Sequence, residues 1–326
     1  VARVYAMDEN IDQNVGKLLA HIDKRNATEN TIVIFMVDNG PNTRRYIGNS
    51  RGKKNEVHDG GIRSPFFMRW PAQLKAGAHS DRIAAHIDVM PTLLEAAGAS
   101  LPSEHPFDGR SILPLLKGEK IDWPDRSLIL QIHRGDAPTP LHHIAVREQR
   151  YKLVHPTGFA NERMPKDVPL ELYDMESDPG ETNNLYEQRP EVSQRLMQTY
   201  ERWFADVSST RPDNYAPPRI ILGTEHETQT TLSTQDMRAT ENGGEWLLRF
   251  ENSKTYNIEF LWKEPVGNLT LELQIGNVRK TLKVNAPTDT TRIQNIRIPN
   301  GDASLSTRIL KGNKKQKPYH IVLIQK

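Results

Sequence analysis

The stretch TIVIFMVDNG, from Thr31 to Gly40, joins a continuous apolar run to an acid, an amide and a glycine. Thr31 to Val37 is rich in β-branched and other apolar residues, a composition typical of fully buried strands in parallel sheets. Open α/β sheets place their ligands at the carboxyl ends of such strands. The sequence therefore predicts a buried parallel strand with a functional site at its exit, where Asp38 and Asn39 lie.

Apolar residues at helical spacing predict one helix before this strand and one after it. They are Ile11, Val15, Leu18, Leu19 and Ile22 in the first helix, and Ile87, Met90, Leu93, Leu94 and Ala97 in the second. A polar stretch from Asp23 to Asn30 ends the first helix, and Gly98 is a suitable stop for the second. Helix, strand, long loop and helix indicate an α/β layer over residues 1–125.

The pattern changes further along the chain. Short strand-like runs and then a helix from Pro190 to about Val207 predict an α+β subdomain over residues 126–208. Residues 209–217 are polar and proline-rich without periodicity, which predicts a linker. Residues 218–326 alternate regularly, so we expect an all-β sandwich. The residues that share a face are Tyr256, Ile258, Phe260 and Trp262 in one run, and Leu269, Leu271, Leu273 and Ile275 in another.

Composition excludes several classes of function. No segment approaches the roughly 20 apolar residues of a membrane span, so we expect no membrane partner. The net charge of +2 comes from 43 basic and 41 acidic residues scattered along the chain, which argues against a nucleic-acid partner. The chain has no cysteine, so it offers no disulfide and no thiolate ligand. It begins at Val1 without a signal peptide, and we expect a mature or truncated piece.

Asp38 and Asn39 carry a carboxylate and an amide carbonyl, the hard oxygen donors that Ca²⁺ or Mg²⁺ takes. The same Asp-Asn-Gly triplet is also typical of a plain turn, so both interpretations stand at this point. Lys54 follows in a glycine-rich loop. A lysine there suits an oxyanion such as sulfate or phosphate, although an isolated loop lysine is more often simply solvated. Gly52, Gly60 and Gly61 would let the backbone approach another segment closely.

Taken together, these residues resemble the central segment of the type I sulfatase family. The family has a strand ending in Asp-Asn-Gly, then a Lys shortly before Glu-Gly-Gly-x-Arg-x-Pro. This sequence has Asp38-Asn39-Gly40, Lys54 and then DGGIRSP at 59–65, with Asp59 in place of Glu. The likeness continues in family order and covers about residues 1–208, through HIDVMPTLLEAAG (86–98), FDGRSILPLLKGE (107–119), AVREQRYKLV (145–154) and LELYDMESDPGETNNL (170–185).

The resemblance implies an alkaline-phosphatase-like sulfatase domain, of which residues 1–125 form the C-terminal part of the catalytic α/β layer. It implies that Asp38 and Asn39 bind Ca²⁺, that Lys54 contacts the sulfate, and that the substrate is a sulfated small molecule or glycan. The family's formylglycine arises from a Cys/Ser-x-Pro-x-Arg motif, which this sequence lacks. The resemblance therefore implies that the nucleophile, the other calcium ligands and the N-terminal part of the domain lie outside this chain. By analogy, we expect a periplasmic or secreted protein.

Other residues remain candidates for a site. His142 and His143 lie in a region that similar enzymes use to shape the substrate pocket, although most such histidines are ordinary surface residues. Trp246, Tyr256 and Trp262 would suit a sugar-stacking platform, but their alternation favours core packing.

Two other functions stay open. One is a phosphodiesterase or phosphatase of the same superfold, against which the Lys54 segment argues, because those enzymes usually need two transition-metal sites. The other is a non-catalytic carbohydrate-binding protein, against which the joint presence of Asp38, Asn39 and Lys54 argues.

Overall fold

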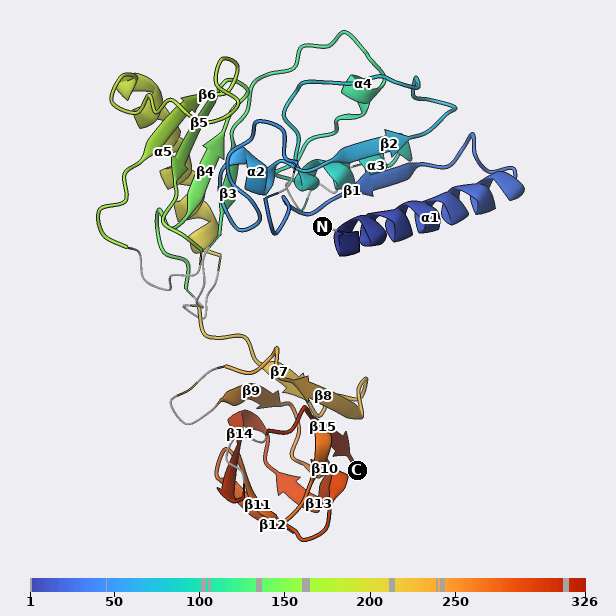
Figure 1. The fold of residues 1–326 in the computed structure, drawn as a ribbon, viewed down its shortest axis with the longest axis vertical. Coiled ribbons are helices and arrows are strands. Elements are labelled where there is room, and N and C mark those ends of the chain that lie inside the picture. Colours follow the sequence, from blue (N-terminus) through green and yellow to red (C-terminus); the bar gives the residue numbers. More distant parts are fainter. Residues whose placement is uncertain are drawn as a thin grey trace. The chain divides into compact units, whose positions relative to one another are not determined.

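The computed structural model describes residues 2–44, 46–100, 104, 107–132, 137–159, 165–210, 215–238, 240, 244–312 and 317–326. The chain divides into two compact units, Val1–Asn214 and Tyr215–Lys326 (Figure 1). Residues 211–214 of the expected linker lie outside the described residues, so the extent of that linker stays a prediction. No helix in the described part of the chain combines the length and apolar character needed to cross a membrane.

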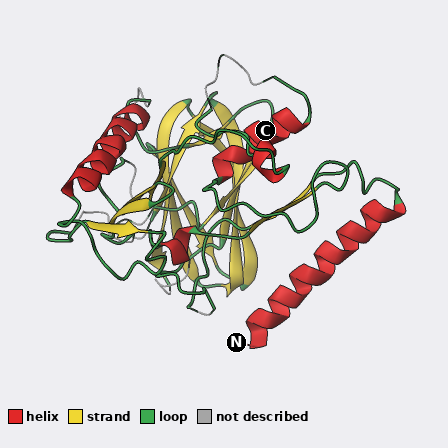
Figure 2. Cartoon of the chain, turned by 90° about the horizontal axis from the view of Figure 1, so that it is seen from above, coloured by secondary structure: helices red, strands yellow, loops and turns green. Residues whose placement is uncertain are grey.

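The first unit begins with the 23-residue helix α1 (Ala2–Lys24), which has no buried residue and lies at the margin of the unit (Figure 2). Strand β1 (Val33–Met36) follows and pairs antiparallel with β2 (Phe66–Arg69). The prediction of a buried parallel strand is therefore wrong for this structure. A strand is buried only when other layers cover it, and the described part of this sheet has two strands, with Phe35 and Met36 each 38% exposed.

Short helices lie in the long connections of the first unit. They are α2 (Asp59–Ile62), the 3₁₀ turn η1 (His86–Asp88), α3 (Val89–Ala96) and α4 (Leu113–Leu116). Helix α3 is the second predicted helix, and Gly98 ends it in the left-handed region at φ +67°. Glycine adopts that conformation without steric cost, so the predicted stop is confirmed.

The expected α+β part contains an antiparallel four-stranded sheet in the order β3-β4-β5-β6. Its strands are β3 (Leu128–Gln131), β4 (Ile144–Arg147), β5 (Tyr151–His155) and β6 (Glu171–Asp174), and helix α5 (Pro190–Ser208) follows them. Val192, Leu196 and Tyr200, four residues apart on α5, pack on one face of the sheet with Ile144, Val146, Leu153 and Leu172. The predicted helix at 190–207 is confirmed.

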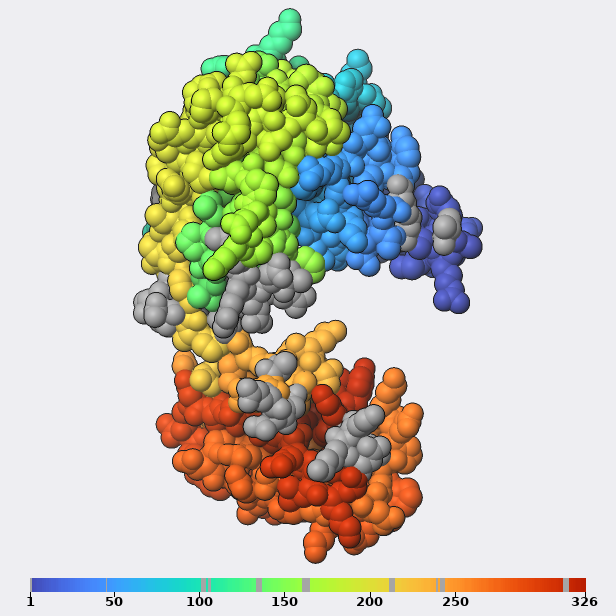
Figure 3. All heavy atoms as spheres, turned by 60° about the vertical axis from the view of Figure 1, so that its left-hand side comes forward, coloured from blue at the N-terminus to red at the C-terminus, as the bar shows by residue number. Residues whose placement is uncertain are grey.

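The other face of this sheet is also covered. Ala145, Val154 and Tyr173 pack against Val57 and Ile62, which belong to the glycine-rich loop and α2. The space-filling view shows blue residues of this N-terminal segment directly against green residues of the sheet (Figure 3). The sheet therefore lies between α5 and the loop that carries Lys54, and this loop packs on the face of the sheet opposite α5.

The second unit contains two sheets that share one core. The five-stranded sheet has the order β12-β11-β14-β9-β7, and the four-stranded sheet has the order β13-β10-β15-β8. The strands are β7 (Ile220–Leu222), β8 (Gln229–Ser233), β9 (Glu245–Phe250), β10 (Lys254–Val266), β11 (Leu269–Ile275), β12 (Val278–Val284), β13 (Thr288–Ile298), β14 (Gly301–Lys311) and β15 (His320–Gln325).

The predicted alternation of β10 and β11 is confirmed, because both apolar faces are buried in the shared core. Trp246, Tyr256 and Trp262 are 3%, 1% and 6% exposed, so these rings are core residues and form no sugar-stacking platform. The two indole N–H groups are satisfied internally, since Trp246 donates to the Ser233 carbonyl and Trp262 to the Thr291 hydroxyl.

Candidate functional site

The chain leaves β1 at Val37, whose main chain is tied to the segment before β2. The N–H of Val37 donates to the Pro65 carbonyl at 3.2 Å. The carbonyl of Val37 accepts hydrogen bonds from the Ser64 hydroxyl at 2.6 Å and from Nε2 of His86 at 3.1 Å. These contacts fix the direction in which the chain continues from Val37 through Asp38 and Asn39.

Three glycines allow the backbones of this region to interlock. The N–H of Gly40 donates to the Gly61 carbonyl at 2.8 Å. A Cβ atom at Gly40 would lie 1.9 Å from the Gly60 carbonyl oxygen, and one at Gly61 would lie 2.0 Å from that of Glu56. A Cβ at Gly60 would lie 2.5 Å from the Gly52 carbonyl oxygen. The predicted close backbone approach is confirmed at Gly60 and Gly61, and no other residue type fits without displacement.

Lys54 is held through its main chain. Its N–H donates to the Pro41 carbonyl at 2.9 Å, so its loop lies beside the Asp38–Gly40 turn. The side chains of Asp38 and Lys54 are exposed and that of Asn39 is half-buried, which leaves all three open to a ligand. The structure thus places these three predicted site residues on adjoining, interlocked loops.

Asp38 and Asn39 fit calcium in kind, because both offer oxygen ligands. They do not suffice in number, since calcium takes six to eight oxygens. No group of three or more His, Asp and Glu side chains able to hold a metal ion occurs among the residues that the structure describes. On the described chain, the two residues are at most part of a calcium site.

A buried ion cluster anchors α2 to the sheet below it. Nζ of Lys152, on β5, lies 2.7 Å from Oδ1 of Asp59 and 2.7 Å from Oε1 of Glu181. The other carboxylate oxygen of Glu181 accepts the N–H of Asp59 at 2.8 Å. The side chains of Lys152 and Glu181 are fully buried. Opposite charges in such a site stabilise one another only while all partners remain.

A second cluster holds the beginning of the same loop. Glu171, on β6, accepts Nη1 of Arg51 at 3.2 Å, Nε2 of His58 at 3.0 Å and the Tyr173 hydroxyl at 2.7 Å. Burial would raise the pKa of Glu171, but the hydrogen bonds from His58 and Tyr173 and the charge of Arg51 outweigh it and hold that pKa below its usual value. Burial and the adjacent carboxylate raise the pKa of Tyr173, which therefore stays a phenol donor.

Sequence reasoning did not assign roles to Lys152, Glu171 or Glu181. The available signal was their position inside the motifs at 145–154 and 170–185, which fold into β5, β6 and the turn before α5. Spacing in the sequence does not reveal them, because they meet Arg51 and Asp59 across roughly a hundred residues. Only the packing of the loop on the sheet brings these charges together.

His142 and His143 are both buried, at 0% and 3% exposure. Nε2 of His143 lies 2.9 Å from the Asn55 carbonyl oxygen, and its Nδ1 accepts the Gly158 N–H at 2.9 Å. Nε2 of His142 lies 3.3 Å from the Gly158 carbonyl oxygen. Neither ring is presented to solvent, so a direct substrate role for them stays a prediction without geometric support. His143 instead supports the turn that follows Lys54.

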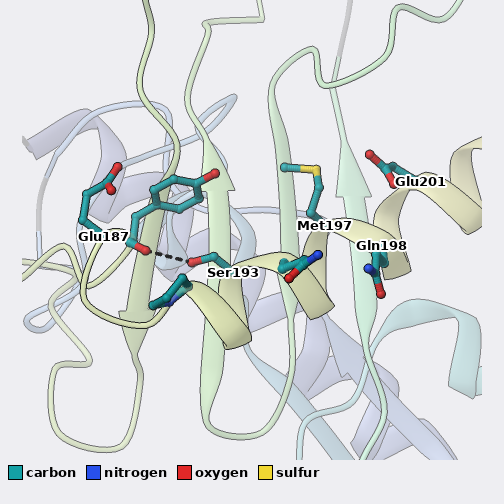
Figure 4. A pocket seen from close by; sticks show the side chains of 8 residues that line it. Glu187, Ser193, Met197, Gln198 and Glu201 are labelled. Carbon is teal, nitrogen blue, oxygen red and sulfur yellow. Dashed lines mark hydrogen bonds between the residues drawn. The ribbon is translucent and has the colours of Figure 1, made fainter.

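A hollow of about 440 Å³ lies elsewhere, along the N-terminal half of α5 (Figure 4). Its lining includes Glu187, Glu201, Gln198 and Met197, and the Ser193 hydroxyl donates to the Tyr186 carbonyl at 3.1 Å. Two carboxylates and no cation line it, so it disfavours a sulfate or phosphate group. An anionic substrate fits the Lys54 loop better.

Two family comparisons match the first unit. Residues 52–205 match the family described as N-sulphoglucosamine sulphohydrolase, C-terminal. Residues 2–99 match the family described as Sulfatase. The two matches overlap over residues 52–99, a range that includes Lys54.

Curated proteins give consistent matches. The chain is 28% identical over 238 residues to an N-acetylglucosamine-6-O-sulfatase of Bacteroides thetaiotaomicron, covering 71% of this chain and 38% of that protein. It is 28% identical over 211 residues to an N-acetylgalactosamine-6-O-sulfatase of the same organism, covering 59% and 40%. It is 33% identical over 210 residues to arylsulfatase A of Homo sapiens, covering 58% and 40%. The chain thus spans about two fifths of the length of these relatives.

Solved structures share the fold. One from work on the metabolism of multiple glycosaminoglycans by Bacteroides thetaiotaomicron superposes with a TM-score of 0.50 at 27% identity, covering 60% of this chain and 43% of that one. The crystal structure of Ps i-CgsB in complex with k-i-k-neocarrahexaose gives a TM-score of 0.50 at 24% identity, covering 59% and 40%. At that lower identity the likeness shows the fold alone.

Proposed function

Residues 2–205 of this chain belong to the sulfatase family, and from that premise we propose that the chain is the C-terminal part of a calcium-dependent sulfatase. The expected alkaline-phosphatase-like fold class is confirmed by the solved structures that superpose on it. Sulfatases are sulfuric ester hydrolases, so the proposed reaction is hydrolysis of a sulfate ester.

The observation that carries this proposal is the interlocked loop pair at the end of β1. Asp38 and Asn39 would supply two oxygen ligands to the calcium ion, and the exposed Lys54 would contact the sulfate group. Calcium, when bound, withdraws charge from the sulfuryl oxygens. Lys54 adds a second positive charge close to the bond that breaks. The hydrogen bonds of Lys54 and Gly40 hold these side chains on a rigid base, which lowers the cost of orienting the substrate.

The nucleophile of the proposed reaction is a formylglycine outside this chain. The sequence contains no cysteine, and no serine is followed by Pro two positions on and Arg four positions on. The remaining calcium ligands would come from the same missing region. We accordingly expect the isolated chain to bind calcium weakly.

A sulfated carbohydrate is the proposed substrate class. The bacterial relatives named as N-acetylglucosamine and N-acetylgalactosamine 6-O-sulfatases support this choice. A periplasmic or secreted location is part of the same proposal, because polymeric carbohydrates are met outside the cytoplasm.

The test is sulfate release by a protein that carries these residues in a domain of the relatives' full length. We expect release of inorganic sulfate from 6-O-sulfated N-acetylhexosamines, and Lys54→Ala should lower kcat/KM by roughly 10²–10³-fold, as the loss of one charge-stabilising donor does. Lys53→Ala is the matched control, since Lys53 is the adjacent exposed lysine, and it should leave kcat/KM nearly unchanged. Hydrolysis of phosphate esters in place of sulfate esters would overturn the proposal in favour of a phosphatase.

A further inference from the structure

Charge is distributed unevenly along the second unit. Residues 278–326 contain 11 Lys and Arg against 2 Asp and Glu, whereas residues 215–277 contain 5 against 9. The whole chain carries only +2, so the basic segment is not part of a generally basic protein. A local excess of this size indicates a surface suited to an anionic partner.

Strand pairing gathers part of this charge on one sheet face. On β11 the residues Leu269, Leu271, Leu273 and Ile275 are buried, so Thr270, Glu272 and Gln274 face outward. Strands β12 and β14 flank β11, and directly paired residues face the same side. Four exposed cations therefore lie on this outward side, which we call the basic face: Arg279 and Lys283 on β12, and Arg308 and Lys311 on β14.

The register sets the spacing of these charges. Lys283 and Lys311 pair with Thr270 from opposite sides, so they lie roughly 10 Å apart across three strands. Arg308 pairs with Glu272, two residues after Thr270 on β11, and Arg279 pairs with Gln274, four residues after Thr270. The result is a strip of cations with hydroxyl and amide groups between them.

Three of the four cations make no ion pair with any residue that the structure describes, although Arg308 lies across from Glu272 in the strand register. Nη1 of Arg279 lies 3.8 Å from Oε2 of Glu272, and Nη2 of Arg279 donates to Oε1 of Gln274 at 3.1 Å. Lys283, Arg308 and Lys311 make no ion pair or side-chain hydrogen bond with any residue that the structure describes. The acid nearest the start of β14, Asp302, is already paired with Arg219 and Arg249. The face therefore keeps an uncompensated positive charge.

Protection of a sheet edge does not explain the basic face. Exposed lysines on edge strands prevent unwanted pairing, and β12 is an edge strand of its sheet. Strand β14 lies between β11 and β9, so it has no free edge to protect. Edge protection therefore does not account for Arg308 and Lys311.

We propose that the basic face binds a sulfated polysaccharide. This inference rests on the proposed function, because the polysaccharide would be the polymer whose sulfate esters the first unit hydrolyses. Lys283, Arg308 and Lys311 contact sulfate groups of an extended chain, and Thr270 and Thr281 offer hydroxyl partners to the sugar. The outward residues of β11 and β12 include no aromatic ring, which disfavours single-stranded nucleic acid, because its bases stack on such rings.

The test uses the full chain and dextran sulfate as the probe, with unsulfated dextran as the neutral polymer. Calorimetric titration should show binding to dextran sulfate that weakens with added salt, and no binding to dextran. The double variant Lys283→Glu/Lys311→Glu should weaken the dextran sulfate affinity by roughly tenfold or more. The control Lys263→Glu/Arg297→Glu makes the same charge change on exposed residues of the other sheet and should have little effect.

Several results would overturn the inference. They are absence of binding, equal weakening by both double variants, or equal affinity for single-stranded DNA and dextran sulfate. Its failure is distinguishable from failure of the proposed function, because hydrolysis of a monosaccharide sulfate by the full-length domain does not involve the basic face. Polymer binding without such hydrolysis would leave the basic face supported and reject the sulfatase proposal.

Discussion

The imidazole ring of His143 is buried between two main-chain groups and is held neutral there. Its Nδ1 accepts the Gly158 N–H, so the proton lies on Nε2 and is donated to the Asn55 carbonyl, one residue after Lys54. Burial is the main cause that lowers the pKa of His143. Adding a proton would place an unsolvated charge in the core and break the hydrogen bond from Gly158. The turn beside Lys54 is therefore sensitive to acid.

The folded protein binds fewer protons at His143 than the unfolded chain, so stability rises with pH in this range. The contribution is fully present above the unfolded histidine pKa of about 6.5 and is lost as pH falls below it. We expect urea denaturation of the first unit to show falling stability from pH 7 to pH 5. His143→Gln should flatten this dependence, and His79→Gln, at an exposed loop histidine, should not. An unchanged slope in His143→Gln would contradict the assignment.

Helices and strands could be predicted from the sequence where the pattern of apolar residues within one element is enough to define its buried face. The amphipathic helix α5 and the alternating strands β10 and β11 were predictable, because their apolar periodicity is enough to define a buried face. The burial of β1 could not be predicted from its own sequence, because it depends on whether other layers of the fold cover the strand. Asp38, Asn39 and Lys54 were singled out through their motif, and their roles in a site stay a prediction. Lys152 and Glu181 were missed, because a lysine in a strand predicts an exposed side chain unless its distant acidic partners are known.

The attachment of α2 to β5 gives a prediction for this missed cluster. Lys152→Met leaves the carboxylates of Asp59 and Glu181 buried without a cation, which should destabilise the first unit by roughly 3–5 kcal/mol. Amide hydrogen exchange at residues 52–61 should accelerate in the same variant, because the loop loses its anchor. Arg150→Met removes the neighbouring pair with Asp174, in which the arginine side chain is 53% exposed, and should have a much smaller effect, because solvent screens exposed ion pairs. Equal effects of the two substitutions would show that the cluster does not anchor the loop.

The first unit as a whole exposes an apolar surface on α1, β1 and β2. Its largest exposed side chains include Met7, Leu18 and Phe67, which are 65%, 66% and 65% accessible. Large exposed apolar patches are covered by a partner in stable proteins or lead to aggregation. Because the chain spans about two fifths of its relatives, we propose that the remaining part of the sulfatase domain covers this surface.

This proposal predicts different behaviour for the isolated chain and for a protein with the full-length domain. The isolated chain should enhance the fluorescence of a dye that binds exposed apolar surface, and it should self-associate in sedimentation experiments. The full-length domain should do neither. Leu18→Ser/Phe67→Ser should reduce the dye signal of the isolated chain, because it removes two of the most exposed apolar groups, while Leu310→Ser on β14 of the second unit serves as the control. A monomeric isolated chain without dye binding would show that α1, β1 and β2 need no cover and would contradict the proposal.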